Sequence, residues 1–261
     1  MKKVISAILA LALCASVAVA SAGCGCQKSK GNPVTSNSSG PGYKIEPTNP
    51  DFAEGDFSFY RLNDKEVKVT VYKGTSKNVE IPATVNGATV TVIEANLFQN
   101  SDIESVTIPS GVTEIQKYAF AGCQNLKKVV IPEGVQSIGV NAFWNCKNLT
   151  SVTLPASLKN VEWTAFSATG IQSITIPESN TFNTLTDKLF FQCRDLKEVT
   201  IPVTITKIAD DTFSECSKDL TIHAYSGSYA ASYAASHNIK LEESARGNAE
   251  EAPQDYEEYY E

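Results

Sequence analysis

LKKVVIPEGVQSIGVNAFWNCKNLTSVTLP, residues 126–155, holds one complete unit of a repeat and the start of the next. Before its proline the unit alternates: Val129 and Ile131 face one side of an extended chain, and the residues between them face the other. Alternating β-branched residues predict a β-strand, and Pro132 ends it because proline cannot donate to a β-ladder. We expect the Val-x-x-Ile step and the Ala-Phe pair that follow to form the far wall of the turn.

The same unit recurs through the middle of the chain with a period of about 23 residues. The prolines that follow Ile or Leu are Pro82, Pro109, Pro132, Pro155, Pro177 and Pro202. The phenylalanines that mark the period are Phe98, Phe120, Phe143, Phe166, Phe190 and Phe213. A period in the low twenties is typical of leucine-rich repeats. One unit cannot bury its apolar side chains alone, whereas stacked units can, at the roughly 4.8 Å spacing of paired strands.

We therefore predict a β-rich leucine-rich-repeat solenoid of about six stacked units, with parallel strands on one face and short turns or helical segments on the other. Caps should close both ends, as repeat stacks require. Residues 57–72 alternate around Asn63-Asp64, and Asn86-Gly87 is a second hairpin signal. At the other end we expect a strand at 220–222, a helix at 228–236 and a last short strand at 239–241.

The structural core should contain the six phenylalanines in a single column. Four cysteines, Cys123, Cys146, Cys193 and Cys216, each follow a phenylalanine by three residues. We place them in the same core, because free cysteine is small and among the most buried residue types. Disulfides between stacked neighbours remain the alternative for a secreted protein. A zinc site is disfavoured because the cysteines follow the repeat and do not cluster in pairs, so we predict no metal.

The two ends of the chain have a different composition from the repeat. Residues 1–23 have the basic start, apolar run and small residues of a secretory signal peptide. Ser21-Ala22-Gly23-Cys24 resembles the lipobox of bacterial lipoproteins, although Ser21 stands where Leu is usual, and the resemblance implies lipidation of Cys24. The alternative is plain cleavage and a soluble secreted product. We expect a tether over 24–53, the solenoid with its caps over 54–243 and an acidic disordered tail over 244–261.

The order Leu-x-x-Val-x-Ile-Pro, Val-x-x-Ile, Ala-Phe-x-x-Cys resembles the BspA-like class of bacterial leucine-rich repeats. Two units depart from it: Thr169 replaces the cysteine in one, and residues 180–183 are inserted in the next. The resemblance implies a curved solenoid and a surface-exposed, often adhesive, binding protein with no enzymatic activity. With the lipobox, it implies a lipid anchor at the extracellular face of a bacterial membrane.

Composition excludes several function classes. The chain has 22 basic and 29 acidic residues, a net charge of −7, and no basic cluster, so we expect no nucleic-acid partner. It has two histidines, and it lacks the motifs of serine hydrolases, zinc proteases and phosphate-binding loops. We therefore expect no catalytic residues and no cofactor.

Two surfaces are candidates for binding. The first is the predicted concave strand face, for which the candidate residues are Ser105, Thr107, Lys128, Ser151, Thr153, Ser173, Thr175, Glu198 and Thr200. Extended faces of solenoids often bind ligands, but threonine there is also ordinary strand chemistry. The second is an aromatic flank of Trp144, Trp163 and Phe191. Exposed aromatic side chains are favoured interface anchors, and the alternative is that the two indoles cover an imperfect unit.

Three functions are compatible with these residues. The first is a lipid-anchored surface protein that adheres to an extracellular protein or glycan. The second is a structural scaffold or spacer of the envelope without a soluble ligand. The third is a lipoprotein that captures polysaccharide, with Trp144 and Trp163 as stacking platforms.

Overall fold

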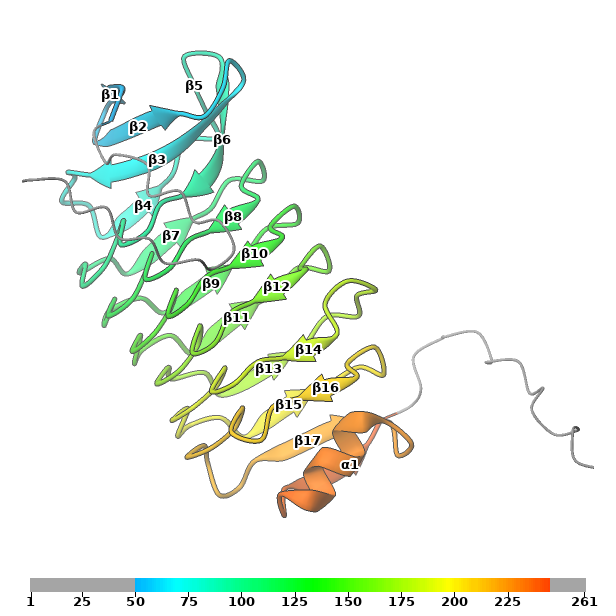
Figure 1. Cartoon of the computed structure of the whole chain (residues 1–261). Coiled ribbons are helices and arrows are strands. Elements are labelled where there is room, and N and C mark those ends of the chain that lie inside the picture. Colours follow the sequence, from blue (N-terminus) through cyan, green and yellow to red (C-terminus); the bar gives the residue numbers. More distant parts are fainter. Residues whose placement is uncertain (1–49, 245–261) are drawn as a thin grey trace, which may run out of the picture. The chain divides into compact units, whose positions relative to one another are not determined.

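The computed structural model describes residues 50–244, which stack short strands into the coils of a solenoid (Figure 1). The predicted leucine-rich-repeat solenoid is confirmed, as a parallel-strand stack with little helix. The predicted signal peptide, Cys24 and nearly all of the predicted tether and acidic tail lie outside the described residues. The first strand begins at Phe52, two residues before the predicted start of the solenoid.

The N-terminal cap contains both predicted hairpins and one further antiparallel strand, β1. Strands β1 (Phe52–Glu54), β2 (Phe57–Arg61) and β3 (Glu66–Tyr72) pair antiparallel, and β5 (Thr84–Val85) pairs antiparallel with β6 (Ala88–Ile93). Strand β6 then pairs in parallel with β3, so the cap leads directly into the stack. Where β3 pairs with β6, Lys68 on β3 forms a buried 3.0 Å ion pair with Glu94, the residue after β6.

Two walls of the stack are strand ladders. The first wall consists of β4 (Asn78–Glu80), β7 (Ser105–Thr107), β9 (Lys128–Val130), β11 (Ser151–Thr153), β13 (Ser173–Thr175), β15 (Glu198–Thr200), β17 (Thr221–Ala224) and β18 (Lys240–Glu243). The second consists of β6, β8 (Glu114–Ile115), β10 (Ser137–Ile138), β12 (Asn160–Val161), β14 (Thr184–Leu185) and β16 (Lys207–Ile208). Neighbouring strands pair in register, one repeat apart: Ser151 lies opposite Lys128, and Val161 opposite Ile138. Along each strand of these two walls, alternate side chains therefore point into the core.

The third wall contains the phenylalanines and is a backbone ladder without regular strands. Residues two before and two after the phenylalanines adopt positive φ: Asn96, Tyr118, Asn141, Thr164 and Lys188 before, and Asn100, Gly122, Asn145, Ala168, Gln192 and Glu215 after. Left-handed residues within a right-handed segment let amide groups point along the stack. The N–H of Phe120 thus donates to the carbonyl of Ala142 at 2.8 Å, and that of Gly122 to Trp144 at 2.7 Å.

The core is filled by a single column of six phenylalanine rings, all buried. Neighbouring rings are stacked with centroids 5.0 to 5.9 Å apart and planes within 14°. Tyr72 covers one end of the column and Tyr233 the other. Offset stacking of this kind adds about 0.5–1.5 kcal/mol per pair beyond the area buried.

The four cysteines lie beside this column as free thiols. Each thiol donates to the carbonyl of the phenylalanine one coil earlier, as Cys123 does to Phe98 at 3.0 Å and Cys193 to Phe166 at 3.1 Å. A small side chain with a donor therefore fits this position. Thr169 keeps the donor, but its hydroxyl bonds to Phe166 of its own coil.

The C-terminal cap is helix α1 (Tyr229–Ser236), followed by β18 on the edge of the first wall. The hydroxyl of Ser228 accepts from the N–H of Ala231 at 3.2 Å and so caps the helix N-terminus. Tyr233 packs its ring edge-on against Phe213 and donates its hydroxyl to the carbonyl of Asp210. Burial raises the pKa of Tyr233 to about 12.

Candidate binding site

The stack is interrupted on two walls at one level. Within the described residues, β11 and β13 belong to different sheets on the first wall, and β12 and β14 do so on the second. On the third wall the ladder continues: Phe166 donates to the carbonyl of Leu189 at 3.1 Å, and Ala168 to that of Phe191 at 2.7 Å. We call this level the coil junction; it lies between the coil of residues 149–171 and the next.

The sequence departures of these two coils explain the junction. Thr169 and Ile171 are two residues apart, where Cys146 and Leu149 are three apart, so one coil is shorter in its turn. The next coil has two extra residues between Pro177 and Phe182. Coils of unequal length cannot keep the same register on every wall, and the phenylalanine centroids are furthest apart here, at 5.9 Å.

Side chains replace some of the backbone bonds that the junction lacks. The hydroxyls of Ser179 and Thr181 donate to the carbonyl of Leu158 at 3.3 and 2.9 Å, and Thr186 donates to that of Val161 at 3.0 Å. Phe182 is buried at the place where the preceding coil carries Leu158 and the following coil Ile205. Phe182 therefore belongs to the repeat, and the insertion predicted over residues 180–183 is two residues long, not four. The larger ring fills the widened interior while the surface stays hollowed.

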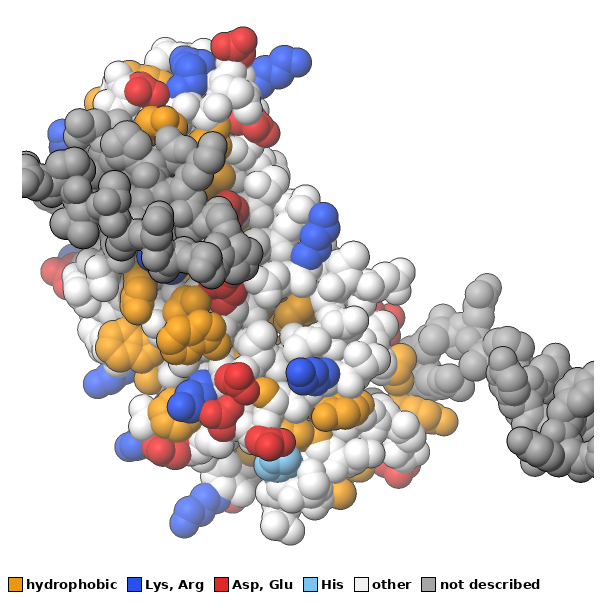
Figure 2. All heavy atoms as spheres, viewed as in Figure 1, with side chains coloured by type: hydrophobic (Ala, Val, Ile, Leu, Met, Phe, Trp, Pro, Cys, Tyr) orange, Lys and Arg blue, Asp and Glu red, His pale blue; other side chains and the backbone are white. Residues whose placement is uncertain are grey.

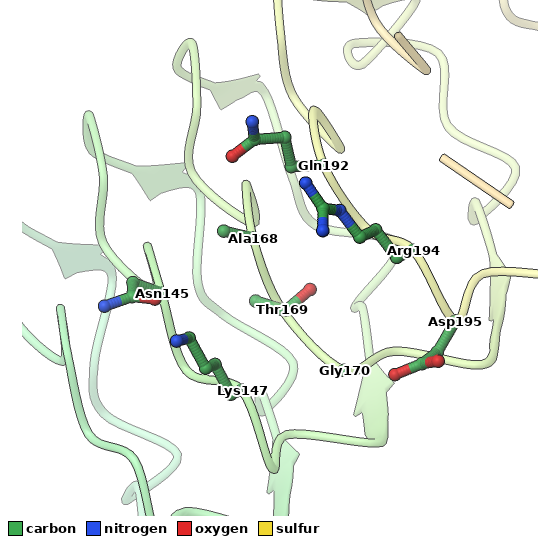
Figure 3. A pocket seen from close by; sticks show the side chains of 8 residues that line it. All are labelled: Asn145, Lys147, Ala168, Thr169, Gly170, Gln192, Arg194 and Asp195. Carbon is green, nitrogen blue, oxygen red and sulfur yellow. The ribbon is translucent and has the colours of Figure 1, made fainter. Parts of the chain in front are cut away.

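Three cavities follow the junction around the solenoid. The strand-face recess, about 460 Å³, is lined by Ser151, Val152, Thr153, Leu154, Ser173, Ile174, Thr175, Pro177, Glu198 and Thr200. The Trp163 recess, about 360 Å³, is lined by Asn160, Glu162, Trp163, Thr186 and Asp187. The flank recess, about 430 Å³, is lined by Asn145, Lys147, Ala168, Thr169, Gly170, Gln192, Arg194 and Asp195 (Figure 3).

The residues predicted for the concave face all lie on the first wall with exposed or half-exposed side chains. Six of the nine line the strand-face recess: Ser151, Thr153, Ser173, Thr175, Glu198 and Thr200. Ser105, Thr107 and Lys128 lie on the neighbouring strands β7 and β9, outside that recess. The recess holds one carboxylate among hydroxyls, a surface suited to hydrogen bonding with polar ligands.

The aromatic flank is exposed. Trp144 is 42% exposed and Trp163 54%, and Figure 2 shows apolar side chains gathered on the face beside the turns that follow β10 and β12. About half of each indole packs against the stack, so the alternative that both cover an imperfect unit stays open beside the interface interpretation. Phe191 is half-buried, and the Lys188 ammonium lies 5.8 Å from its ring centroid. No ring contact in the described part of the chain joins the two indoles.

Reactive groups do not converge on these recesses. Within residues 50–244, no three His, Cys, Asp or Glu side chains form a group that could hold a metal. Burial raises the pKa of Cys193 to about 11 and that of Cys216 to about 12, so both are thiols at neutral pH. His223 lies on β17, between β15 and the edge strand β18 of the first wall, 3.6 Å from Glu242 and 4.0 Å from Glu198.

Comparison with known proteins fixes the family. Residues 91–220 match the model of the BspA type leucine rich repeat region in six copies. The chain belongs to the BspA-type leucine-rich repeat family. Proteins of this repeat class are typically non-enzymatic. No curated protein sequence matches the chain.

The solved structure of one leucine-rich repeat protein shows the same fold as the BspA-type chain. The leucine rich repeat protein TpLRR of T. pallidum, 20% identical, aligns with a TM-score of 0.56 over 72% of this chain and 95% of that one. A leucine rich cell surface protein of Faecalibacterium prausnitzii is 19% identical over 74% and 94% of the chains, with a TM-score of 0.33. The pneumococcal vaccine antigen PcpA is 18% identical over 75% and 70%, with a TM-score of 0.42.

Among residues 50–244, no helix is long and apolar enough to cross a bilayer.

Proposed function

We propose that this BspA-type protein is a cell-surface binding protein that presents its solenoid to an extracellular protein or glycan, held to the membrane by lipid on Cys24. Family membership supports binding or adhesion in general, and the lipobox-like sequence supports the anchor. One observation carries the proposal furthest: both tryptophans of the chain have exposed side chains, Trp144 at 42% and Trp163 at 54%.

Trp144 and Trp163 are exposed, whereas the six phenylalanines of the column are buried. Trp163 lines a recess at the coil junction, and Trp144 lies one coil earlier. Tryptophan is enriched among the few interface residues that carry most of the binding energy. A rigid stack also presents these side chains preorganised, which lowers the entropic cost of association.

The binding proposal is tested with Trp144→Ala and Trp163→Ala in the full chain, by pull-down from cell-surface extracts and on a glycan array. We expect each variant to weaken partner binding by roughly thirtyfold or more, because loss of an interface anchor costs at least about 2 kcal/mol. Leu62→Ala is the matched control, because Leu62 is 42% exposed and lies in the N-terminal cap. Unchanged binding in both tryptophan variants contradicts the aromatic flank, and no partner in either assay favours the scaffold function.

The anchor is tested separately. Cys24→Ser should move the protein from the detergent phase to the aqueous phase in a partition experiment, because stable membrane attachment needs the acyl chains. An unchanged distribution would contradict lipidation at Cys24 and leave the binding proposal untouched.

A further inference from the structure

The flank recess exists because one coil lacks a side chain at a position where its neighbours have one. Four residues after each phenylalanine the repeat carries Asp102, Gln124, Lys147, Gly170, Arg194 and Ser217. A Cβ on Gly170 would lie 2.2 Å from the backbone carbonyl oxygen of Lys147, so any other residue would force the backbone to move. The shortened turn thus forms a floor that no side chain fills.

Two cations stand on opposite sides of this floor. Lys147 comes from the coil before Gly170 and Arg194 from the coil after it, at the equivalent repeat position. Figure 3 shows Lys147 and Asn145 on one side of the floor, and Gln192 and Arg194 on the other. Among the described ion pairs neither cation has a partner, whereas Lys77 and Lys127 both pair with Glu104.

Because the whole chain is acidic, Lys147 and Arg194 form a local site for anions on a surface that otherwise repels them. The chain carries a net charge of −7, so it does not attract anions in general, and an anion that binds must do so at a local site. Arg and Lys donate charge-assisted hydrogen bonds to carboxylates, and arginine does so in a bidentate manner. The carboxylate of Asp195 also lines the recess, where it can accept hydrogen bonds from hydroxyl groups but would repel a second negative charge.

We propose that the flank recess binds an acidic sugar of a glycan, with the sugar carboxylate between Lys147 and Arg194 and its hydroxyls toward Asp195 and the amides of Asn145 and Gln192. A cavity of about 430 Å³ has the size of a small-molecule site. A carboxylate and several hydroxyls on one small ring match two cations, one carboxylate and two amides. This site goes beyond the proposed function, because its residues are separate from the aromatic flank.

The test is an NMR titration of the ¹⁵N-labelled full chain that follows the backbone amide of Gly170. Glucuronic acid and N-acetylneuraminic acid are the probes, and the methyl ester of each is the matched ligand, because it keeps every hydroxyl and lacks the charge. We expect saturable shifts at Gly170 and Thr169 with at least one acid, and binding of its ester weaker by about tenfold or more, the size of a charged hydrogen bond.

Variants test the two cations. Lys147→Gln and Arg194→Gln should each weaken binding of the acid by about tenfold, and both side chains are exposed, so the fold should be retained. Lys159→Gln is the control: it removes one exposed cation that lines none of the recesses, and binding should stay within about twofold.

Three results would overturn the site. They are no shift at Gly170 with either acid, equal shifts with acid and ester, and acid binding that survives both Lys147→Gln and Arg194→Gln. Tighter binding of an acidic peptide, hexa-aspartate, at the same amides would overturn the assignment to sugar. Failure of this site leaves the aromatic flank intact, because loss of partner binding in Trp144→Ala and Trp163→Ala is measured independently.

Discussion

At the scale of single residues, the third wall accepts side chains that ordinarily avoid its backbone conformation. Thr164 has a φ of 57°, where a β-branched residue is a steric outlier, and Asn96 and Asn141 hold the same position in other coils. Left-handed backbone costs a typical L-residue roughly 1–2 kcal/mol, and asparagine tolerates it better. The regular wall therefore imposes a left-handed φ on whichever residue occupies this position, and the hydrogen bonds of the ladder offset the conformational cost.

Thr164→Asn should raise the free energy of unfolding by about 1 kcal/mol, because asparagine relieves this local strain. Urea denaturation of the variant and the parent chain measures the difference. Thr206→Asn is the control, since Thr206 is exposed and its φ is not positive. A Thr164→Asn variant no more stable than the parent would contradict strain at this position.

The buried thiols should make the fold sensitive to alkaline pH. Burial raises the pKa of Cys193 from 9.0 to about 11, so the folded state retains a proton that the unfolded chain releases. The stability linked to this thiol is complete below pH 9 and is lost as pH rises from about 9 to about 11, at roughly 1.4 kcal/mol per pH unit.

Cys193→Thr removes this titration, and threonine already occupies the equivalent position at Thr169. Unfolding under reducing conditions at pH 7, 9 and 10 should show a steeper loss of stability in the parent chain than in the variant. Parallel losses in both proteins would contradict the raised pKa of this thiol.

At the scale of the repeated element, we expect the phenylalanine column to contribute most of the stabilising free energy. Phe143 is fully buried and stacks on rings 5.0 and 5.3 Å away, whereas the next residue, Trp144, is 42% exposed. Truncation of a buried phenylalanine leaves a cavity and typically costs about 3–5 kcal/mol. A surface truncation usually stays within about 0.5 kcal/mol.

Phe143→Ala should therefore destabilise the fold by about 3–5 kcal/mol, and Trp144→Ala by about 0.5 kcal/mol or less. Chemical denaturation measures the free energy of unfolding of both variants, which differ from the parent at adjacent residues of the same coil. Similar small losses in both would mean that the column contributes little to stability.

The repeat element was predictable in outline because its period and polarity are local. Val129 and Pro132 mark a strand and its end, and Phe143 recurs with the period that a stack requires. The left-handed backbone of the third wall was missed, because Tyr118, Lys188 and similar residues there give no glycine signal.

The candidate site was predictable only in part. Exposed threonines and tryptophans could be placed from the repeat frame, but Lys147 and Arg194 look like ordinary turn residues in sequence. The signal that could have found the flank recess is the missing residue between Thr169 and Ile171 together with Gly170. Sequence alone does not tell whether such a deletion is absorbed in a turn or opens a cavity, because that depends on how neighbouring coils stack.

At the scale of the whole described region, the coil junction divides the stack into two sets of ladders. In repeat proteins stability is approximately a sum of neighbour contacts, so a level with fewer backbone bonds should open first. Hydrogen exchange should be faster at Ile174 and Leu185, whose strands border the junction, than at Val129 and Ile138, whose strands are paired on both sides. Uniform protection across all coils would contradict a weak level.

At the coil junction the ladders of the first and second walls are interrupted and that of the third wall continues, so the third wall can act as a hinge. There the N–H groups of Phe166 and Ala168 still donate to the next coil. Opening at this level would change the angle between two otherwise stiff halves and would widen the strand-face recess on the first wall. One shortened turn would thus give a stiff solenoid a hinge at which its surface could adjust to a bound partner.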